Sequence, residues 1–299
     1  MSWYLPAGTS RAGNVETNIT PESAGWAYSG MQVYTLEAGT NIDFELAHEE
    51  CVIVPLSSQN ISVTTNHGEF HLQGREGVFA AVTDWLYLPN GSSASLVADS
   101  GEVAVCTARA QSDFPACYTP AQNVPVEVRG GGKASRQVTN IATPDSFKGA
   151  RKINVCEVIT PGGNWSSWPP HRHDGIDGCI ATNEEIYYFR IGREESLHGD
   201  PVGLGTFHVY TIDGSVDESV TVKDGDAYLV PQGYHGPTIA PPEYPMYFLN
   251  VLAGPAEDRT MAFCDDPDHH WIRQTWETQG TDPRLPYTSA HGRTQGNNS

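Results

Sequence analysis

The chain has 299 residues, of which 38% are hydrophobic, and it carries a formal net charge of −19. This length suits one large or two ordinary domains, and the acidic balance excludes nucleic acid and anionic membrane surfaces as partners. No apolar run approaches the ~18 residues of a membrane span, and the first residues do not resemble a signal peptide, so the expected compartment is the cytoplasm.

Almost the whole chain is predicted to form short β-strands separated by turns, because 30 glycines and 21 prolines interrupt segments rich in Val, Ile, Tyr and Phe. In chain order, the expected strands are residues 31–36, 50–56, 77–88, 102–108, 152–160, 186–191, 205–212, 219–222, 226–231 and 244–251. The best helical pattern is short and covers residues 273–279. Many short strands of this kind predict an all-β sandwich or barrel.

The chain also reads as two copies of one plan. A strand that ends in Pro89-Asn-Gly91 has a counterpart that ends in Pro231-Gln-Gly233. We therefore expect two tandem barrels, residues 1–118 and 125–280, joined by a linker at residues 118–125. The polar residues 281–299 are expected to form a poorly ordered tail. The six cysteines contain no Cys-x-x-Cys pair and are expected to be reduced and mainly buried.

The strongest functional signal is the histidine pair of the run Pro-Pro-His-Arg-His-Asp. His171 and His173 are two positions apart, so on a strand both imidazoles point to one face. Glu185 opens the next apolar run and His235 follows a third. Three imidazoles and one carboxylate on neighbouring strands suit a divalent ion such as Zn, Mn, Fe, Co or Ni.

Two adjacent glutamates compete for the carboxylate position. Glu185 shares its face with Tyr187 and Phe189, a bulky set suited to a barrel interior, whereas Glu184 lies on the opposite face. The alternation favours Glu185 as the metal ligand. Glu184 is kept as a candidate base or as a group that supports a ligand.

This order of residues resembles the two-part motif of the cupin superfamily, whose double-stranded β-helix, or jelly-roll, barrel holds a metal. Two spacings depart from that motif. Eleven residues separate His173 from Glu185, where most cupins have a few, and one residue separates Gly233 from His235, where most have two. The first half lacks the His-x-His pair and the histidine after Pro-x-Gly, so its barrel is expected to be metal-free and structural.

Longer runs extend the resemblance over about residues 1–280. Thr160-Pro-Gly-Gly-Asn-Trp-Ser-Ser-Trp-Pro-Pro-His-Arg-His-Asp174 and Tyr247-Phe-Leu-Asn-Val-Leu-Ala-Gly-Pro255 closely resemble the 5-deoxy-glucuronate isomerase family of inositol catabolism. The resemblance implies a bicupin that converts 5-deoxy-glucuronate to 5-dehydro-2-deoxy-gluconate. It also implies a divalent metal in the second barrel, as in the ketol-isomerases of pectin-derived uronates.

The implied reaction moves a carbonyl from C1 to C2 of a small anionic sugar acid, by proton transfer or by a metal-assisted hydride shift. The candidate acid–base residues are Glu184, Tyr187 and Tyr234. The candidate substrate-binding residues, three of them cations for the carboxylate, are Arg136, Arg190, Lys133 and Asn250.

Other functions fit the same ligand set. A metal-dependent cupin dioxygenase, or an isomerase of another small uronate, is the alternative enzyme, and a dioxygenase would need oxygen. A storage or sugar-sensing bicupin is disfavoured, because the ligand set is complete and no DNA-binding module is evident. Edge strands in cupins often pair between subunits, so a homo-oligomer is compatible with the sequence.

Overall fold

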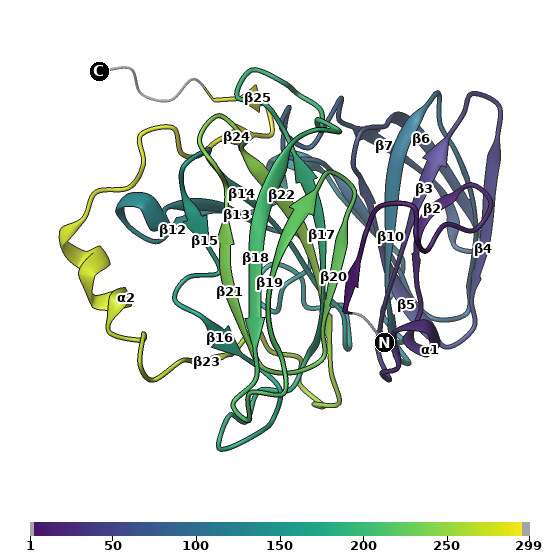
Figure 1. Cartoon of the computed structure of the whole chain (residues 1–299). Helices are drawn as coiled ribbons and strands as arrows, with labels where there is room; N and C mark the ends of the chain where they lie inside the picture. Colours follow the sequence, from purple (N-terminus) through teal and green to yellow (C-terminus); the bar gives the residue numbers. More distant parts are fainter. Residues whose placement is uncertain (1–2, 295–299) are drawn as a thin grey trace.

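The computed structural model describes residues 3–294, and in it each half of the chain forms a barrel of antiparallel sheets (Figure 1). The larger sheet of the first barrel has the order β11 (Cys117–Thr119), β8 (Trp85–Leu88), β5 (Glu49–Pro55), β10 (Gly101–Arg109), β3 (Ser29–Leu36) and β2 (Val15–Ile19). Its smaller sheet has the order β4 (Asn41–Leu46), β9 (Ser92–Val97), β6 (Gln59–Thr65) and β7 (Gly68–Gly74).

The second barrel repeats this plan. Its larger sheet has the order β1 (Tyr4–Leu5), β20 (Ala227–Val230), β17 (Glu184–Ile191), β22 (Met246–Ala253), β14 (Asn154–Thr160), β13 (Arg136–Asn140) and β12 (Val126–Arg129). Its smaller sheet has the order β19 (Asp217–Lys223), β18 (Leu204–Tyr210), β21 (Tyr234–Ile239), β16 (His171–Arg172) and β23 (Cys264–Asp265), and β15 (Trp165–Ser166) pairs with β21. A short hairpin, β24 (Thr288–Ser289) and β25 (Gly292–Arg293), follows. The predicted all-β bicupin of two jelly-roll barrels is confirmed.

Helices are few and short. They are α1 (Pro21–Ala24), η1 (Ala121–Asn123), η2 (Gly132–Ala134), α2 (Ile272–Thr275) and η3 (Trp276–Thr278). The last two replace the helix expected at residues 273–279. Among residues 3–294, no helix is long and apolar enough to cross a membrane.

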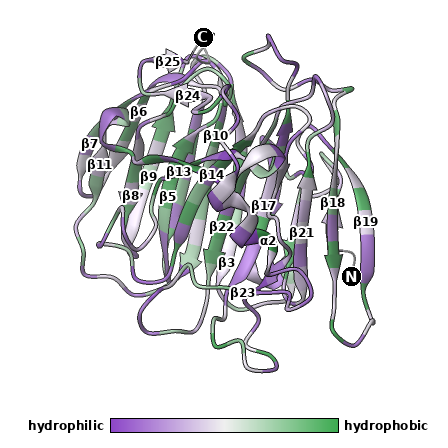
Figure 2. Ribbon diagram, turned by 90° about the vertical axis from the view of Figure 1, so that its left-hand side faces the viewer, coloured by the Kyte–Doolittle hydropathy of each residue, from purple (hydrophilic) through white to green (hydrophobic). Residues whose placement is uncertain are grey.

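The two larger sheets pack face to face, and this packing explains their composition. Every residue of β14 and β22 is buried, because one face lines the second barrel and the other meets the first barrel. A shared core of side chains such as Val52, Val54, Ile186, Tyr188 and Leu249 lies between the sheets. Figure 2 shows the hydrophobic residues concentrated on the central strands, whereas α2 is largely hydrophilic.

Strand register reveals which positions correspond in the two barrels. Cys51 pairs with Leu88, directly before Pro89, just as Glu185 pairs with Val230, directly before Pro231. Cys51 therefore takes the place of the candidate metal-binding glutamate in the first barrel. Its side chain lies in an apolar interior with residues such as Ile53, Leu86 and Leu96.

The preceding glutamates also correspond, and they join the barrels reciprocally. The Glu50 carboxylate accepts hydrogen bonds from the backbone amides of residues 151–153 in the second half, at 2.6 to 3.1 Å. The Glu184 carboxylate accepts hydrogen bonds from the amides of residues 27–29 in the first half, at 2.6 to 2.8 Å. Each barrel thus holds a loop of the other through an anionic side chain.

The two ends of the chain differ from expectation. Residues 4–5 form β1, which pairs with β20 of the second barrel rather than with the first barrel. Gln137 accepts hydrogen bonds from the amides of Tyr287 and Thr288 at 2.7 and 2.9 Å, and both residues are buried. The prediction of a poorly ordered tail is therefore wrong for residues 281–294, while residues 295–299 lie outside the described residues.

Two of the six cysteines are bonded to each other. Cys179 and Cys264 form a disulfide, so the prediction that the cysteines are reduced is wrong for this pair. The other four are free, and Cys51, Cys106 and Cys156 are buried as expected. The pairing was hidden in the sequence, because the two half-cystines are 85 residues apart.

Candidate metal centre and substrate cavity

His173, Glu185 and His235 converge inside the second barrel. His173 follows β16, Glu185 lies in β17 and His235 lies in β21, so three strands supply them. Nε2 of His173 and Nε2 of His235 lie 2.9 and 3.0 Å from the same oxygen, Oε2 of Glu185. All three side chains are buried, so the group is shielded from water on most sides.

The histidine tautomers fit a metal ion. Nδ1 of His173 lies 2.9 Å from the Asn183 carbonyl oxygen, and Nδ1 of His171 lies 3.3 Å from that of Pro169. In a neutral ring whose Nδ1 donates to the carbonyl, Nε2 carries the lone pair, and this is the usual arrangement behind a metal-binding histidine. Nε2 of His235 is buried and makes no hydrogen bond to any described residue, despite its contact with Glu185.

The charge of Glu185 also suits a cation. Burial alone would raise the pKa of Glu185, but contacts with His173 and His235 lower that pKa to about 2. The carboxylate is therefore ionised. An ionised carboxylate beside two imidazoles is a donor set that suits a divalent ion.

His171 lies beside this group without joining its tightest part. Its ring centroid is 4.5 Å from that of His235 and 6.4 Å from that of His173. It lines the same cavity, and the Phe263 ring packs against it at 4.8 Å. Its role as the fourth ligand remains a prediction.

A cavity of about 360 Å³ opens in front of the histidines. Tyr187 and Asn250, which are direct cross-strand neighbours, line it together with Ser167. The Tyr187 hydroxyl lies 3.2 Å from the Ser167 hydroxyl, and the Asn250 Nδ2 is buried without a hydrogen bond to any described residue. Burial, and then the nearby Glu185 charge, raise the pKa of Tyr187 well above its usual value, so the phenol keeps its proton in this structure.

Three arginines line the outer part of this cavity. Arg129 pairs with Glu127 at 2.6 Å, and Arg273 pairs with Asp265 at 2.6 Å. Arg136 is buried and has no carboxylate partner among residues 3–294, although it donates to the Ala134 carbonyl and lies over the Trp276 ring. Burial, and then repulsion from the other two arginines, lower the pKa of Arg136 to about 9. An anion placed here would relieve that repulsion.

The glycine-rich turn before Arg136 has a steric cause. Gly130 has φ +84°, and a Cβ atom there would lie 2.1 Å from the Ala134 carbonyl oxygen and 2.7 Å from Nη1 of Arg136. A Cβ atom on Gly131 would lie 3.0 Å from the Trp276 Cα atom. Gly130 thus lets the backbone pass close to the guanidinium, and Gly131 lets it pass close to Trp276.

Four predicted site residues lie outside the cavity. Glu184 is bound to amides of the first barrel, so a role as base does not fit its position. Arg190 donates to Asp224 at 2.9 Å and contacts Glu102, which occupies its guanidinium far from the substrate cavity. The Tyr234 ring packs at a tilt against Tyr210 and lies under the Arg172 guanidinium, and Lys133 is exposed on η2. These four residues have structural rather than substrate-facing surroundings.

Sequence reasoning also missed several residues of the cavity. Ser167 lay inside the distinctive run before the histidines, and Arg129 lay within a few residues of Arg136, so both had a local signal. Met261, Phe263 and Arg273 had none, because they come from a stretch without regular structure and from the short helix α2.

Known proteins resemble this chain over most of its length. The model of the KduI/IolB family matches residues 3–272. A protein named 5-deoxy-glucuronate isomerase from Geobacillus thermodenitrificans is 41% identical over 267 residues, which cover 88% of this chain and 92% of the relative. One of the same name from Halalkalibacterium halodurans is 36% identical, with 85% and 92% covered.

Solved structures agree. The crystal structure of an IolB-like protein from Salmonella typhimurium has a TM-score of 0.80 at 35% identity and covers 90% of this chain and 98% of its own. Bacillus subtilis oxalate decarboxylase, which has Mn(II) centres, has a TM-score of 0.61 at 14% identity, with 89% of this chain and 80% of its own covered, and this likeness shows the fold alone. By its sequence and its fold, the chain belongs to the KduI/IolB family.

Proposed function

We propose that this protein is a metal-dependent aldose–ketose isomerase that converts 5-deoxy-glucuronate to 5-dehydro-2-deoxy-gluconate in inositol catabolism. One observation carries the proposal: a single cavity joins a His/Glu group fit for a divalent ion to a buried arginine without a carboxylate partner. A uronate has the matching parts, a carbonyl at one end and a carboxylate at the other. The relatives named 5-deoxy-glucuronate isomerase support this choice of uronate.

The metal would be held by His171, His173, Glu185 and His235, and would be one of Zn, Mn, Fe, Co or Ni. When bound, such an ion supplies Lewis acidity toward the oxygens of the substrate. The first barrel, with Cys51 at the glutamate position, is proposed to be metal-free and structural.

The remaining groups would bind and orient the substrate. Arg136 would hold the carboxylate through its planar pair of N–H donors. Tyr187 and Asn250 would donate hydrogen bonds to hydroxyl or carbonyl oxygens near C1 and C2, where negative charge develops during isomerisation. Both side chains sit on adjacent central strands, which fix their positions.

The test is an anaerobic NMR assay of metal-reconstituted protein with 5-deoxy-glucuronate, beside a His173→Ala variant. We expect the ketone product with the first and none with the second. A reaction that requires oxygen would contradict the proposal and indicate a dioxygenase. The absence of conversion with each of the five metals would contradict it as well.

The same assay in D₂O separates the two routes of hydrogen transfer. Proton transfer through a protein group exposed to solvent places deuterium at C1 of the ketone product, whereas a hydride shift carries the C2 hydrogen across without exchange. Because Glu184 and Tyr234 lie outside the cavity, and among residues 3–294 its lining has no carboxylate or imidazole besides the proposed metal ligands, we expect little deuterium. Full incorporation of one deuterium would contradict that expectation.

A further inference from the structure

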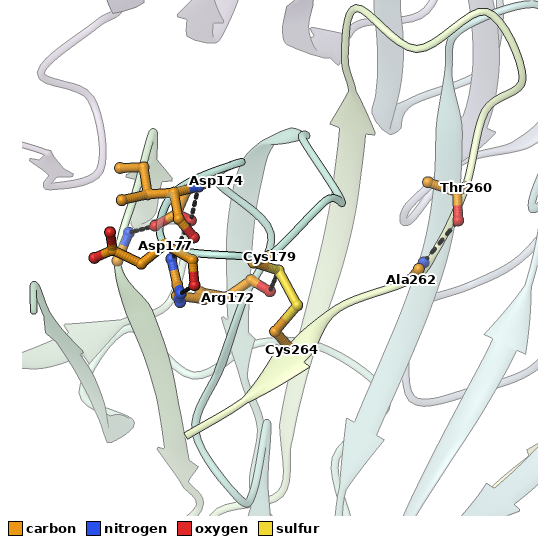
Figure 3. Close-up of a disulfide and its surroundings, with 9 residues drawn as sticks. Arg172, Asp174, Asp177, Cys179, Thr260, Ala262 and Cys264 are labelled. Carbon is orange, nitrogen blue, oxygen red and sulfur yellow. Dashed lines mark hydrogen bonds and ion pairs between the residues drawn. A yellow bond between two sulfur atoms is a disulfide. The ribbon is translucent and has the colours of Figure 1, made fainter. Parts of the chain in front are cut away.

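The unusual spacing between His173 and Glu185 has a structural counterpart. The eleven residues between them form a loop that carries Cys179, and Cys179 is bonded to Cys264 with a Cα–Cα distance of 5.8 Å. Figure 3 shows this disulfide joining the loop to strand β23. The two half-cystines are thus brought together beside β16, the strand of His171.

The loop side of the disulfide is held by other contacts as well. Arg172 donates hydrogen bonds to Asp174 Oδ1 at 2.8 Å and to the Asp177 carbonyl at 3.2 Å. Asp174 in turn accepts a hydrogen bond from the Gly233 amide at 2.9 Å. Since both side chains of the Arg172–Asp174 pair are buried, we expect the loop to keep its shape without the sulfur bridge.

The other side is held at its start but not at its end: Lys152 donates hydrogen bonds to the carbonyl oxygens of residues 255 and 256, and Arg259 donates to those of residues 142, 143 and 153. Residues 254–263, between β22 and β23, contain no regular secondary structure. Thr260 accepts a hydrogen bond from the Asn183 side chain at 3.0 Å, and its hydroxyl accepts one from the Ala262 amide at 3.0 Å (Figure 3). Phe263 is 42% exposed, so little apolar burial holds the end of this segment.

The end of this segment, residues 261–263, lies beyond those hydrogen bonds and forms part of the substrate cavity. Met261, Ala262 and Phe263 line it, and Phe263 packs on His171. The Arg273 guanidinium lies over the Phe263 ring at 4.9 Å and pairs with Asp265, the residue after Cys264. The position of β23 therefore sets the position of an aromatic wall and of one arginine.

We propose that the Cys179–Cys264 disulfide is a positioning element for the substrate-binding wall, so that thiol–disulfide exchange at this pair changes substrate affinity. In the exchange, a dithiol reductant gives two electrons and two protons to the bond. The products are two protein thiols and one reductant disulfide. The kinetic consequence rests on the proposed isomerase function, whereas the change in segment 254–265 does not.

The structural half is tested on the whole metal-loaded protein. Thiol titration after unfolding, without reductant, should find four thiols, and six after reduction. Hydrogen–deuterium exchange should rise in residues 254–265 on reduction and stay unchanged in residues 174–178. Six thiols before reduction, or unchanged exchange in residues 254–265, would overturn the proposal even if the protein showed no isomerase activity.

The kinetic half compares Cys179→Ser and Cys264→Ser with Cys117→Ser, a free cysteine in the first barrel. KM for 5-deoxy-glucuronate should rise about tenfold, with kcat changed less, when the wild type is reduced and in either of the first two variants without reductant. The reason is that substrate binding must then order the substrate-binding wall, which costs conformational entropy. Cys117→Ser should behave as wild type and still respond to reductant. Unchanged KM in both disulfide variants would overturn the proposal, since His173, Glu185 and His235 keep an active centre in either case.

Discussion

At the scale of single residues, Arg136 is distinguished by what it lacks. Its neighbours Arg129 and Arg273 each have a carboxylate partner, and Arg136 has none among the described residues. A charged hydrogen bond to the substrate carboxylate contributes about 1.5–3 kcal/mol. Arg136→Ala should therefore raise KM by about 10- to 100-fold with a smaller change in kcat.

Steady-state kinetics checks this prediction, with Arg129→Ala as the matched control. Arg129 is exposed and already paired with Glu127, so its loss should raise KM only a few-fold. Thermal melting shows whether either variant is folded. Equal KM effects in the two variants would show that Arg136 does not hold the carboxylate.

Tyr187 and Glu184 should differ sharply when each loses its polar group. Tyr187→Phe keeps the buried ring but removes a hydrogen-bond donor that faces the substrate, so kcat should fall by about 100-fold. Glu184→Gln removes a charge that holds amides of residues 27–29, so unfolding should become easier by about 1–3 kcal/mol while kcat stays near wild type.

Denaturant unfolding and turnover, measured on both variants, check this separation. A slow Glu184→Gln enzyme of normal stability would contradict the structural role of Glu184. A Tyr187→Phe enzyme with normal kcat would exclude the phenol from the reaction.

The neighbouring residues Glu184 and Glu185 show what the sequence could predict at this scale. The alternation of side chains along a strand correctly separated Glu185, which faces the barrel interior, from Glu184. The same alternation places Arg190 on the face of Glu184, away from the cavity. The prediction that Arg190 binds the substrate is therefore inconsistent with the alternation that separates Glu185 from Glu184. Phe263 and Arg273 could not be found, because only the tertiary fold brings them to the histidines.

At the scale of elements, strands with strong apolar content were predicted best. Residues 186–191 were expected as a strand and lie in β17, and of the expected strand 244–251 residues 246–251 lie in β22. The hairpin β6–β7 was missed, because half of its residues face solvent and are polar. Residues 77–84 were expected to be strand, but only Trp85–Leu88 forms one. Residues 281–294 look like a tail in sequence because their partner, Gln137, lies about 150 residues away.

The approach of β15 to β21 depends on one glycine. Gly236, next to His235, has φ +101°, and a Cβ atom there would lie 1.8 Å from the Ser167 carbonyl oxygen. Gly236→Ala should therefore displace His235 or the Ser167 segment, lowering the melting temperature and the amount of bound metal. Metal analysis after dialysis and thermal melting measure both effects.

Gly214→Ala is the matched control, because Gly214 also has a positive φ, +69°, but a Cβ atom there meets nothing within 4 Å. The Gly214→Ala variant should lose only about 1–2 kcal/mol of folding stability, the cost of a side chain in the left-handed backbone region, and should keep its metal. If Gly236→Ala behaved like this control, close packing at Gly236 would not be what positions His235.

At the scale of the whole molecule, a buried ion pair joins the two barrels behind the cavity. Arg75, after β7, forms an ion pair with Glu157 of β14, and both side chains are almost fully buried. Tyr247 donates a hydrogen bond to the same carboxylate at 2.7 Å, and Arg75 also donates to the Pro55 carbonyl at 3.0 Å. The network thus anchors the first barrel to β14. The residues on either side of Glu157 in that strand, Cys156 and Val158, line the cavity.

Removing one partner leaves an uncompensated buried charge. Arg75→Met should therefore destabilise the protein by about 3–5 kcal/mol, while the double variant Arg75→Met, Glu157→Leu should recover much of that loss, because it removes both charges. Denaturant unfolding of the two single variants and the double variant gives the coupling energy. Since Glu157 points away from the cavity, the double variant should retain substrate binding, provided that the barrels stay joined by Glu50 and Glu184. A double variant that is stable but inactive would instead show that the ion pair, and with it the first barrel, sets the geometry of the second barrel.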